Sequence, residues 1–201
     1  MLKKIASIIS TILHPLLMPT IGILVIFSTE SHITFIPFEF RRLVTIIVFV
    51  STCILPLSAI PIFLQTGIIK SIHMETPRER ILPLLTTGFF FILGYYFLKK
   101  FQLPAFIPLF FLGTLVAVII SMCISFFWKI SIHMIGVGGL FGALISMTLK
   151  YGVDTNIWIM VTIAISGLLG SSRLGANAHS PAQVYSGFFL GCGTICSIVM
   201  I

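Results

Sequence analysis

Seven stretches of this chain contain no Lys, Arg, Asp or Glu, and this spacing of charges restricts the fold more than any other feature of the sequence. The stretches are Ile5–Thr29, Leu43–Ile69, Ile81–Leu98, Phe101–Trp128, Ile130–Leu149, Thr155–Ser172 and Leu174–Ile201. Each is close to or longer than the roughly 18 to 20 residues that a helix needs to cross about 30 Å of hydrocarbon. Lipid admits only helices and closed barrels, and these stretches are apolar on all sides rather than alternating as barrel strands do. The sequence therefore predicts an all-α, polytopic membrane helix bundle with six or seven transmembrane helices.

The composition agrees with a single integral membrane domain that covers residues 1–201. The chain is 58% hydrophobic and only 8% charged, whereas an ordinary soluble domain is roughly a quarter charged. The first stretch decides between six and seven spans, because His14, Pro15 and Pro19 interrupt it and residues 3–13 could instead lie in the membrane interface. We interpret this N-terminal segment as retained, because HPLLMP interrupts the apolar region that a cleaved signal peptide would need.

The loops divide into two faces if the chain crosses the membrane at every stretch. One face receives the N-terminus, the loop over residues 67–80, the junction over residues 128–133 and the segment Ser171–Gln183. This face carries three of the five histidines and four isolated cations: His73, His133, His179, Arg78, Arg80, Lys129 and Arg173. The opposite face carries flanking pairs such as Lys99 with Lys100, which are typical interface anchors. The net charge of +7 is thus spread over span ends, and it does not form the basic patch of a nucleic-acid-binding protein.

Each polar residue on the first face also has a purely structural interpretation. Lys129 follows Trp128, as interfacial anchors do, and His133 could bond a neighbouring helix. Arg173 could extend toward the interface, and His179 could cap the next helix. However, ionisable residues between membrane segments are costly and mark functional sites by default. The convergence of two histidines, several cations and nearby hydroxyls therefore favours a site.

Transfer of a phosphoryl group from a membrane-embedded donor is the chemistry that suits this set of residues. Cations and helix N-termini bind phosphate oxygens, a neutral histidine can attack phosphorus, and a protonated histidine can donate to the leaving oxygen. Only two carboxylates, Glu75 and Glu79, lie on this face, which argues against a Mg²⁺-dependent site. We expect no metal and no cofactor.

The same residues resemble the motifs of the type 2 phosphatidic acid phosphatase superfamily. Its third motif is Ser-Arg, five residues, His, three residues, Asp; here Ser172-Arg173, His179 and Gln183 keep every spacing, with Gln in place of Asp. Its second motif is Pro-Ser-Gly-His, of which Ser131 and His133 are kept. Its first motif is Lys, six residues, Arg-Pro; Lys70, Arg78, Arg80, Pro77 and Pro83 supply the residue types without that spacing. The resemblance covers Lys70 to Gln183 and implies a phosphatase-like core over approximately residues 70–201.

The resemblance implies a role for each matching residue. His179 would be the nucleophile that forms a phosphohistidine, His133 the general acid, and Arg173 the clamp on the phosphate. Hydrogen bonds and positive charge would come from Ser131, Ser172, Arg78, Arg80 and Lys129. Gln183 would orient His179 through its amide oxygen, without the charge that the carboxylate of the family supplies.

Two glycine-rich stretches begin close to the two histidines. Gly136, Gly138, Gly139 and Gly142 follow His133, and Gly187, Gly191 and Gly193 follow His179. Glycines at this spacing allow membrane helices to approach closely. Close packing of these two helices would bring His133 and His179 together.

These observations predict a membrane-embedded, metal-independent phosphatase that acts on a lipid phosphate or a polyprenyl diphosphate. The alternative is a non-catalytic lipid-phosphate-binding or transport protein on the same scaffold, and haem ligation by the histidines is a third interpretation. The expected location is the cytoplasmic membrane of a bacterium. Without the four candidate phosphate ligands, the first face keeps three Lys and Arg residues and the opposite face has five. By the positive-inside rule, the active face then points away from the cytoplasm.

Overall fold

The computed structural model describes residues 10–29, 31–71 and 78–201, and within these ranges the chain is helical and contains no strand. Six helices in these described ranges are long and apolar enough to cross a membrane. The first, Phe38–Gln65, consists of α3 (Phe38–Phe49), a π-helical turn (Val50–Ile54) and α4 (Leu55–Gln65). The others are α5 (Ile81–Leu98), α6 (Phe106–Ser125), α7 (Ile132–Tyr151), α8 (Asn156–Gly175) and α9 (Pro181–Met200). The predicted helical membrane bundle is therefore confirmed.

The first apolar stretch does not form a full span among the described residues. A helix that is broken at His14 and Pro15 precedes α2, which runs only over Met18–Ser28. Eleven residues of helix are about 16 Å long, roughly half of the hydrocarbon thickness. The interruption follows from Pro15, which cannot donate the hydrogen bond that would continue the preceding helix, whereas Pro19 lies in the first turn of α2, where proline is tolerated. The described residues thus form six long apolar helices and the shorter α2, and residues 10–17 lie at the end of the bundle where α7 begins.

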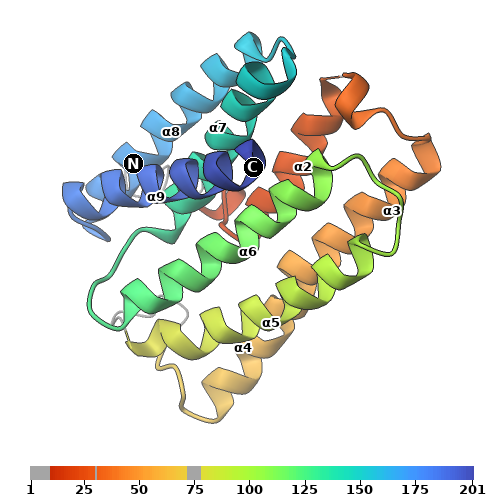
Figure 1. Ribbon diagram of the computed structural model, residues 1–201. Helices are drawn as coiled ribbons and strands as arrows, with labels where there is room; N and C mark the ends of the chain where they lie inside the picture. The colour runs from red at the N-terminus through yellow and green to blue at the C-terminus, as the bar shows by residue number, and fades with distance from the viewer. Residues whose placement is uncertain (1–9, 30, 72–77) are drawn as a thin grey trace.

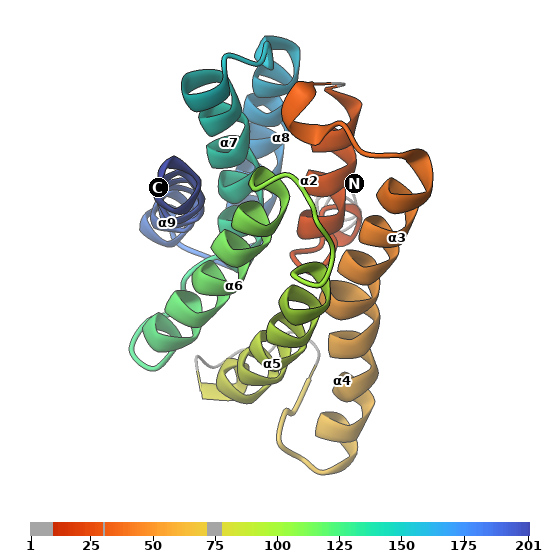
Figure 2. The same cartoon turned by 45° about the vertical axis from the view of Figure 1, so that its right-hand side comes forward.

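Helix α7 lies between α8 and α9 (Figures 1 and 2), and its contact with α9 is made backbone against backbone. A Cβ atom on Gly138 would collide with the carbonyl oxygen of Phe188, and one on Gly142 would lie 2.5 Å from the carbonyl oxygen of Cys192. The contact partners advance along both helices together, from Gly138 with Phe188 to Gly142 with Cys192, so α7 and α9 run in the same direction. The predicted glycine packing is present, and it places the first turns of α7 and α9 side by side.

The remaining helices extend this pair into a bundle. Helix α6 packs on α9, α5 packs on α6, and α3 and α4 pack on α5. Helix α2 lies between α3 and α7, as Figure 2 shows. At one end of the bundle the segments predicted to share a face meet: Arg80 Nη1 donates to the carbonyl oxygen of Ile130 (3.2 Å), and Ser131 N donates to the carbonyl oxygen of Gln183 (3.3 Å). This end contains the candidate site.

Candidate functional site

His179 lies in the short connection between α8 and α9. Helix α8 ends in hydrogen bonds from Asn177 N to Leu174 O and from Ala178 N to Arg173 O, and Asn177 takes a left-handed conformation (φ 52°) that turns the chain. His179 then follows with only 8% of its surface exposed. The connection therefore folds His179 into the bundle rather than toward solvent.

Helix α9 is capped by Ser180 and not by His179. The Ser180 side chain accepts a hydrogen bond from Gln183 N (3.4 Å), and the Gln183 side chain accepts one from Ser180 N (3.1 Å). This reciprocal arrangement is a capping box. The structural interpretation in which His179 caps the helix is therefore wrong, and the imidazole is available for another role.

The imidazole of His179 is held through Nδ1. This atom lies 3.1 Å from Gln183 Oε1 and 3.3 Å from the carbonyl oxygen of Lys129. Both partners are acceptors, so Nδ1 carries the hydrogen, and in the neutral ring Nε2 carries the lone pair. Because Gln183 Oε1 also accepts from Ser180 N, the capping box fixes the orientation of the amide. The expected contact from Gln183 to His179 is thus present, and it selects the tautomer in which Nε2 carries the lone pair.

The surroundings of His179 favour its neutral form. Burial is the largest effect and, with the nearby charges of Arg80, Arg173 and Lys129, it lowers the pKa of His179 to about 4, while the hydrogen bond with Gln183 opposes this shift. Burial and the charge of Arg173 also lower the pKa of Arg80, to about 10. At neutral pH the arrangement is therefore an uncharged imidazole beside guanidinium groups that remain cationic.

The two arginines reach the site from different elements. Arg80 ends the short 3₁₀ turn before α5 and is only 7% exposed. Arg173 lies in the last turn of α8, where its Nη1 donates to Ser10 Oγ (3.3 Å). Its Nε is buried and has no hydrogen-bond partner among the described residues. A buried donor without a partner costs free energy unless a ligand satisfies it.

The two serines of the motifs differ in what their hydroxyl groups do. Ser131 is completely buried at the N-cap position of α7, and its hydroxyl has no partner within the described part of the chain. In contrast, Ser172 donates its hydroxyl hydrogen to Leu168 O of its own helix (2.8 Å). The structure therefore leaves the Ser131 hydroxyl without a partner among the described residues and engages Ser172 in α8.

His133, in the first turn of α7, faces the N-terminal segment. Its Nε2 donates to the carbonyl oxygen of Ser10 (3.2 Å), and the His14 ring meets it edge-on with centroids 5.9 Å apart. His133 is also close enough to Arg173 and His179 for their charges to interact. Sequence reasoning missed Ser10 and His14 as members of this cluster, although the helix-breaking His14-Pro15 pair marked an irregular segment there.

Two predicted groups lie partly or wholly outside the described residues. Arg78 belongs to the 3₁₀ turn before α5, but its side chain is not described, and His73 lies in the range 72–77. The site described here therefore comprises His133, His179, Arg80, Arg173, Lys129, Ser131 and Gln183. Comparison of the chain with family models, curated proteins and solved structures finds no match.

Proposed function

We propose that this protein is a membrane phosphatase that hydrolyses a lipid phosphate or diphosphate through a phosphohistidine on His179. One observation carries the proposal: the buried imidazole of His179 is held at Nδ1 by two acceptors and lies near cations that include Arg80 and Arg173. The same cluster contains two buried donors without partners among the described residues, Ser131 Oγ and Arg173 Nε. A phosphate group would satisfy both donors and balance the positive charge.

The proposed reaction has two steps. Nε2 of His179 attacks phosphorus, a P–N bond forms, and the P–O bond to the lipid or to its inner phosphate breaks. His133, in its protonated form, donates the Nε2 hydrogen that bonds to Ser10 O in the structure to the leaving oxygen and becomes neutral. Water then attacks phosphorus and gives a proton to neutral His133, the P–N bond breaks, and inorganic phosphate and the neutral imidazole of His179 are released. Arg80, Arg173 and the amide groups at the start of α7 stabilise the charge that develops on the phosphate oxygens.

Gln183 makes this proposal chemically distinct from the family pattern. Its amide oxygen holds Nδ1–H as a carboxylate would, but it adds no negative charge beside the cationic imidazole that forms during the reaction. We therefore expect hydrolysis to be slower than it would be with a carboxylate at position 183. Membership of the type 2 phosphatidic acid phosphatase superfamily, location in a bacterial cytoplasmic membrane, and a site that faces away from the cytoplasm are parts of the same proposal.

A non-catalytic lipid-phosphate-binding or transport protein is the second candidate. The neutral Gln183 favours it, and so does the bond between His133 Nε2 and the Ser10 backbone, because both weaken the chemistry without weakening phosphate binding. Arg80, Arg173 and Ser131 would serve either function.

Phosphate release from a panel of lipid phosphates and polyprenyl diphosphates by the purified protein tests the proposal. We expect release that survives EDTA, because protein cations and a helix N-terminus bind the phosphate. Release that EDTA abolishes and Mg²⁺ restores would contradict the mechanism. Tight binding of the panel without any release would favour the non-catalytic candidate.

A further inference from the structure

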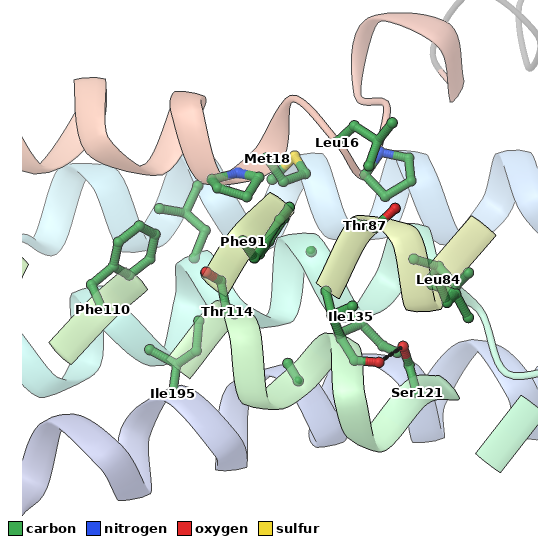
Figure 3. A pocket seen from close by; sticks show the side chains of 18 residues that line it. Leu16, Met18, Leu84, Thr87, Phe91, Phe110, Thr114, Ser121, Ile135 and Ile195 are labelled. Carbon is green, nitrogen blue, oxygen red and sulfur yellow. Dashed lines mark hydrogen bonds between the residues drawn. The ribbon is translucent and has the colours of Figure 1, made fainter. Parts of the chain in front are cut away.

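An apolar cavity of about 60 Å³ lies inside the bundle between α2, α5, α6 and α7 (Figure 3). Residues along its length include Leu84, Thr87 and Phe91 of α5, and Thr114 and Phe110 of α6. Its hydroxyl groups are already engaged in their own helices, because Thr87 donates to Pro83 O (2.7 Å) and Thr114 to Phe111 O (2.7 Å). The cavity therefore offers a ligand mainly apolar surface.

One end of this cavity adjoins the phosphate-binding residues. Ile132 lines the cavity and follows Ser131, whose buried hydroxyl has no partner in the described part of the chain. Pro15 lines the same end and follows His14, which contacts the His133 ring. Two lining residues, Ile132 and Pro15, are thus direct chain neighbours of site residues.

The cavity runs along the helices from this end toward the middle of the bundle. On α7 its lining extends from Ile132 to Leu140, which is about 12 Å of helix. Half of the hydrocarbon thickness is about 15 Å, so the cavity covers most of the depth of one leaflet. Figure 3 shows the same order on the neighbouring helices, with Leu84 and Ser121 near one end and Phe110 and Ile195 near the other.

We propose that this cavity receives one hydrocarbon chain of the substrate, while the phosphate of the same molecule lies at Ser131 and Arg173. This inference rests on the proposed function and narrows its substrate class to amphiphiles that can insert a single slender chain. The position and direction of the cavity match a lipid whose head lies at the membrane surface and whose chain points to the midplane. The small volume favours one unbranched chain over a ring or a pair of chains, because protein interiors tolerate little overpacking.

Two positions at different depths allow a matched test. Thr114 is deep in the cavity, and Thr87 is nearer to the site (Figure 3). Thr114→Phe and Thr87→Phe fill the cavity, whereas Thr114→Val and Thr87→Val remove the hydroxyl group at nearly constant volume and serve as controls. Thr114→Leu and Thr87→Leu replace any Phe variant that does not fold.

The substrates are monoalkyl phosphates of increasing chain length, assayed by phosphate release in one detergent. We expect Thr114→Phe to lower kcat/KM for the longest chains by roughly tenfold or more and to leave the shortest ester unchanged. Thr87→Phe should lower kcat/KM for shorter chains as well, because Thr87 is nearer to the site. The Val controls should show the same dependence on chain length as the wild type. An identical dependence on chain length in all variants would overturn the proposal.

Photolabelling separates this proposal from the proposed function. The probe is an alkyl phosphate with a diazirine at the chain end, and labelled residues are identified by mass spectrometry. We expect label on Phe91, which is 2% exposed, rather than on Phe89 of the same helix, which is 60% exposed. Label on Phe91 without hydrolysis of any ester would refute the phosphatase and keep the cavity assignment. Hydrolysis with label only on Phe89 would keep the phosphatase and refute the cavity assignment.

Discussion

The imidazole Nδ1 of His179 lies 3.1 Å from the side-chain oxygen of Gln183, one helical turn further along the chain. The same oxygen accepts from Ser180 N, so a single amide caps helix α9 and orients the imidazole. The orientation of the His179 imidazole therefore depends on the cap of helix α9. A change at Gln183 therefore affects both the cap and the imidazole, whereas the side chains of Ser180 and His179 can be changed one at a time.

His179→Ala should abolish phosphate release and leave the protein folded. We expect a loss on the order of 10⁴ or more, because the variant has no nucleophile. The measurement is phosphate release from wild type and variant in one detergent preparation, with thermal unfolding as the check on folding. Ser180→Ala is the matched control: it removes the cap at a cost of about 1 kcal/mol and should keep hydrolysis. Equal release by His179→Ala and wild type would refute the nucleophile assignment.

Gln183→Asp should keep or raise the rate of hydrolysis. A carboxylate at this position accepts the same hydrogen bond and stabilises the cationic imidazole that forms when the phosphate is transferred. Gln183→Leu removes the acceptor and should lower the rate. Rates of the three proteins on one substrate provide the comparison, and the orienting role would be wrong if Gln183→Leu reacted as fast as wild type.

His133→Ala should slow hydrolysis by about 10² to 10⁴, which is the usual contribution of a general acid. The reduction should be larger for substrates with poor leaving groups, because these need the proton most. Rates for a series of phosphate esters with leaving groups of different acidity measure this dependence. A reduction that is the same for all leaving groups would assign His133 to phosphate binding instead.

Hydrolysis should persist well below neutral pH and fall as the pH drops through about 4. The pKa of His179 is lowered to about 4 from an ordinary value of 6.5, so the neutral imidazole dominates above pH 4. The unfolded chain takes up this proton near pH 6.5, so folding stability should decline as the pH falls from 6.5 toward 4. The kcat/KM profile and the melting temperature against pH test the two effects. In Gln183→Asp the acidic limb should move to higher pH, because a carboxylate raises the pKa of His179.

The site end of the bundle should be accessible from outside the cytoplasm. The face opposite the site keeps more Lys and Arg residues once the candidate phosphate ligands are set aside, and such residues gather on the cytoplasmic side. Single cysteines placed at Lys70 and at Asp154 in a cysteine-free background would report opposite faces. We expect an impermeant reagent to label position 70 in intact cells. Exclusive labelling of position 154 would reverse the orientation.

The helices and their limits follow from the sequence because their causes are local. Each long helix must be long enough to cross the hydrocarbon, and its charges must lie at its ends. Pro15 interrupts the first apolar stretch, and Pro19 lies in the first turn of α2. The shared face of His133 and His179 follows from the number of crossings between them. Their approach follows from glycines such as Gly138 and Gly142, which allow α7 and α9 to touch.

Only the tertiary structure decided which side chains meet inside that face. Ser10 lies 163 positions before Arg173, yet its hydroxyl accepts from that guanidinium group, and its carbonyl binds His133. Ser172 keeps its motif position but bonds to its own helix, whereas Ser131 remains without a partner among the described residues. These contacts depend on the crossing of helices that are distant in the chain and on the short α2 beside them. Outside the glycine-rich faces of α7 and α9, no spacing in the sequence predicts which helices cross, because apolar helices in lipid present similar surfaces on every side.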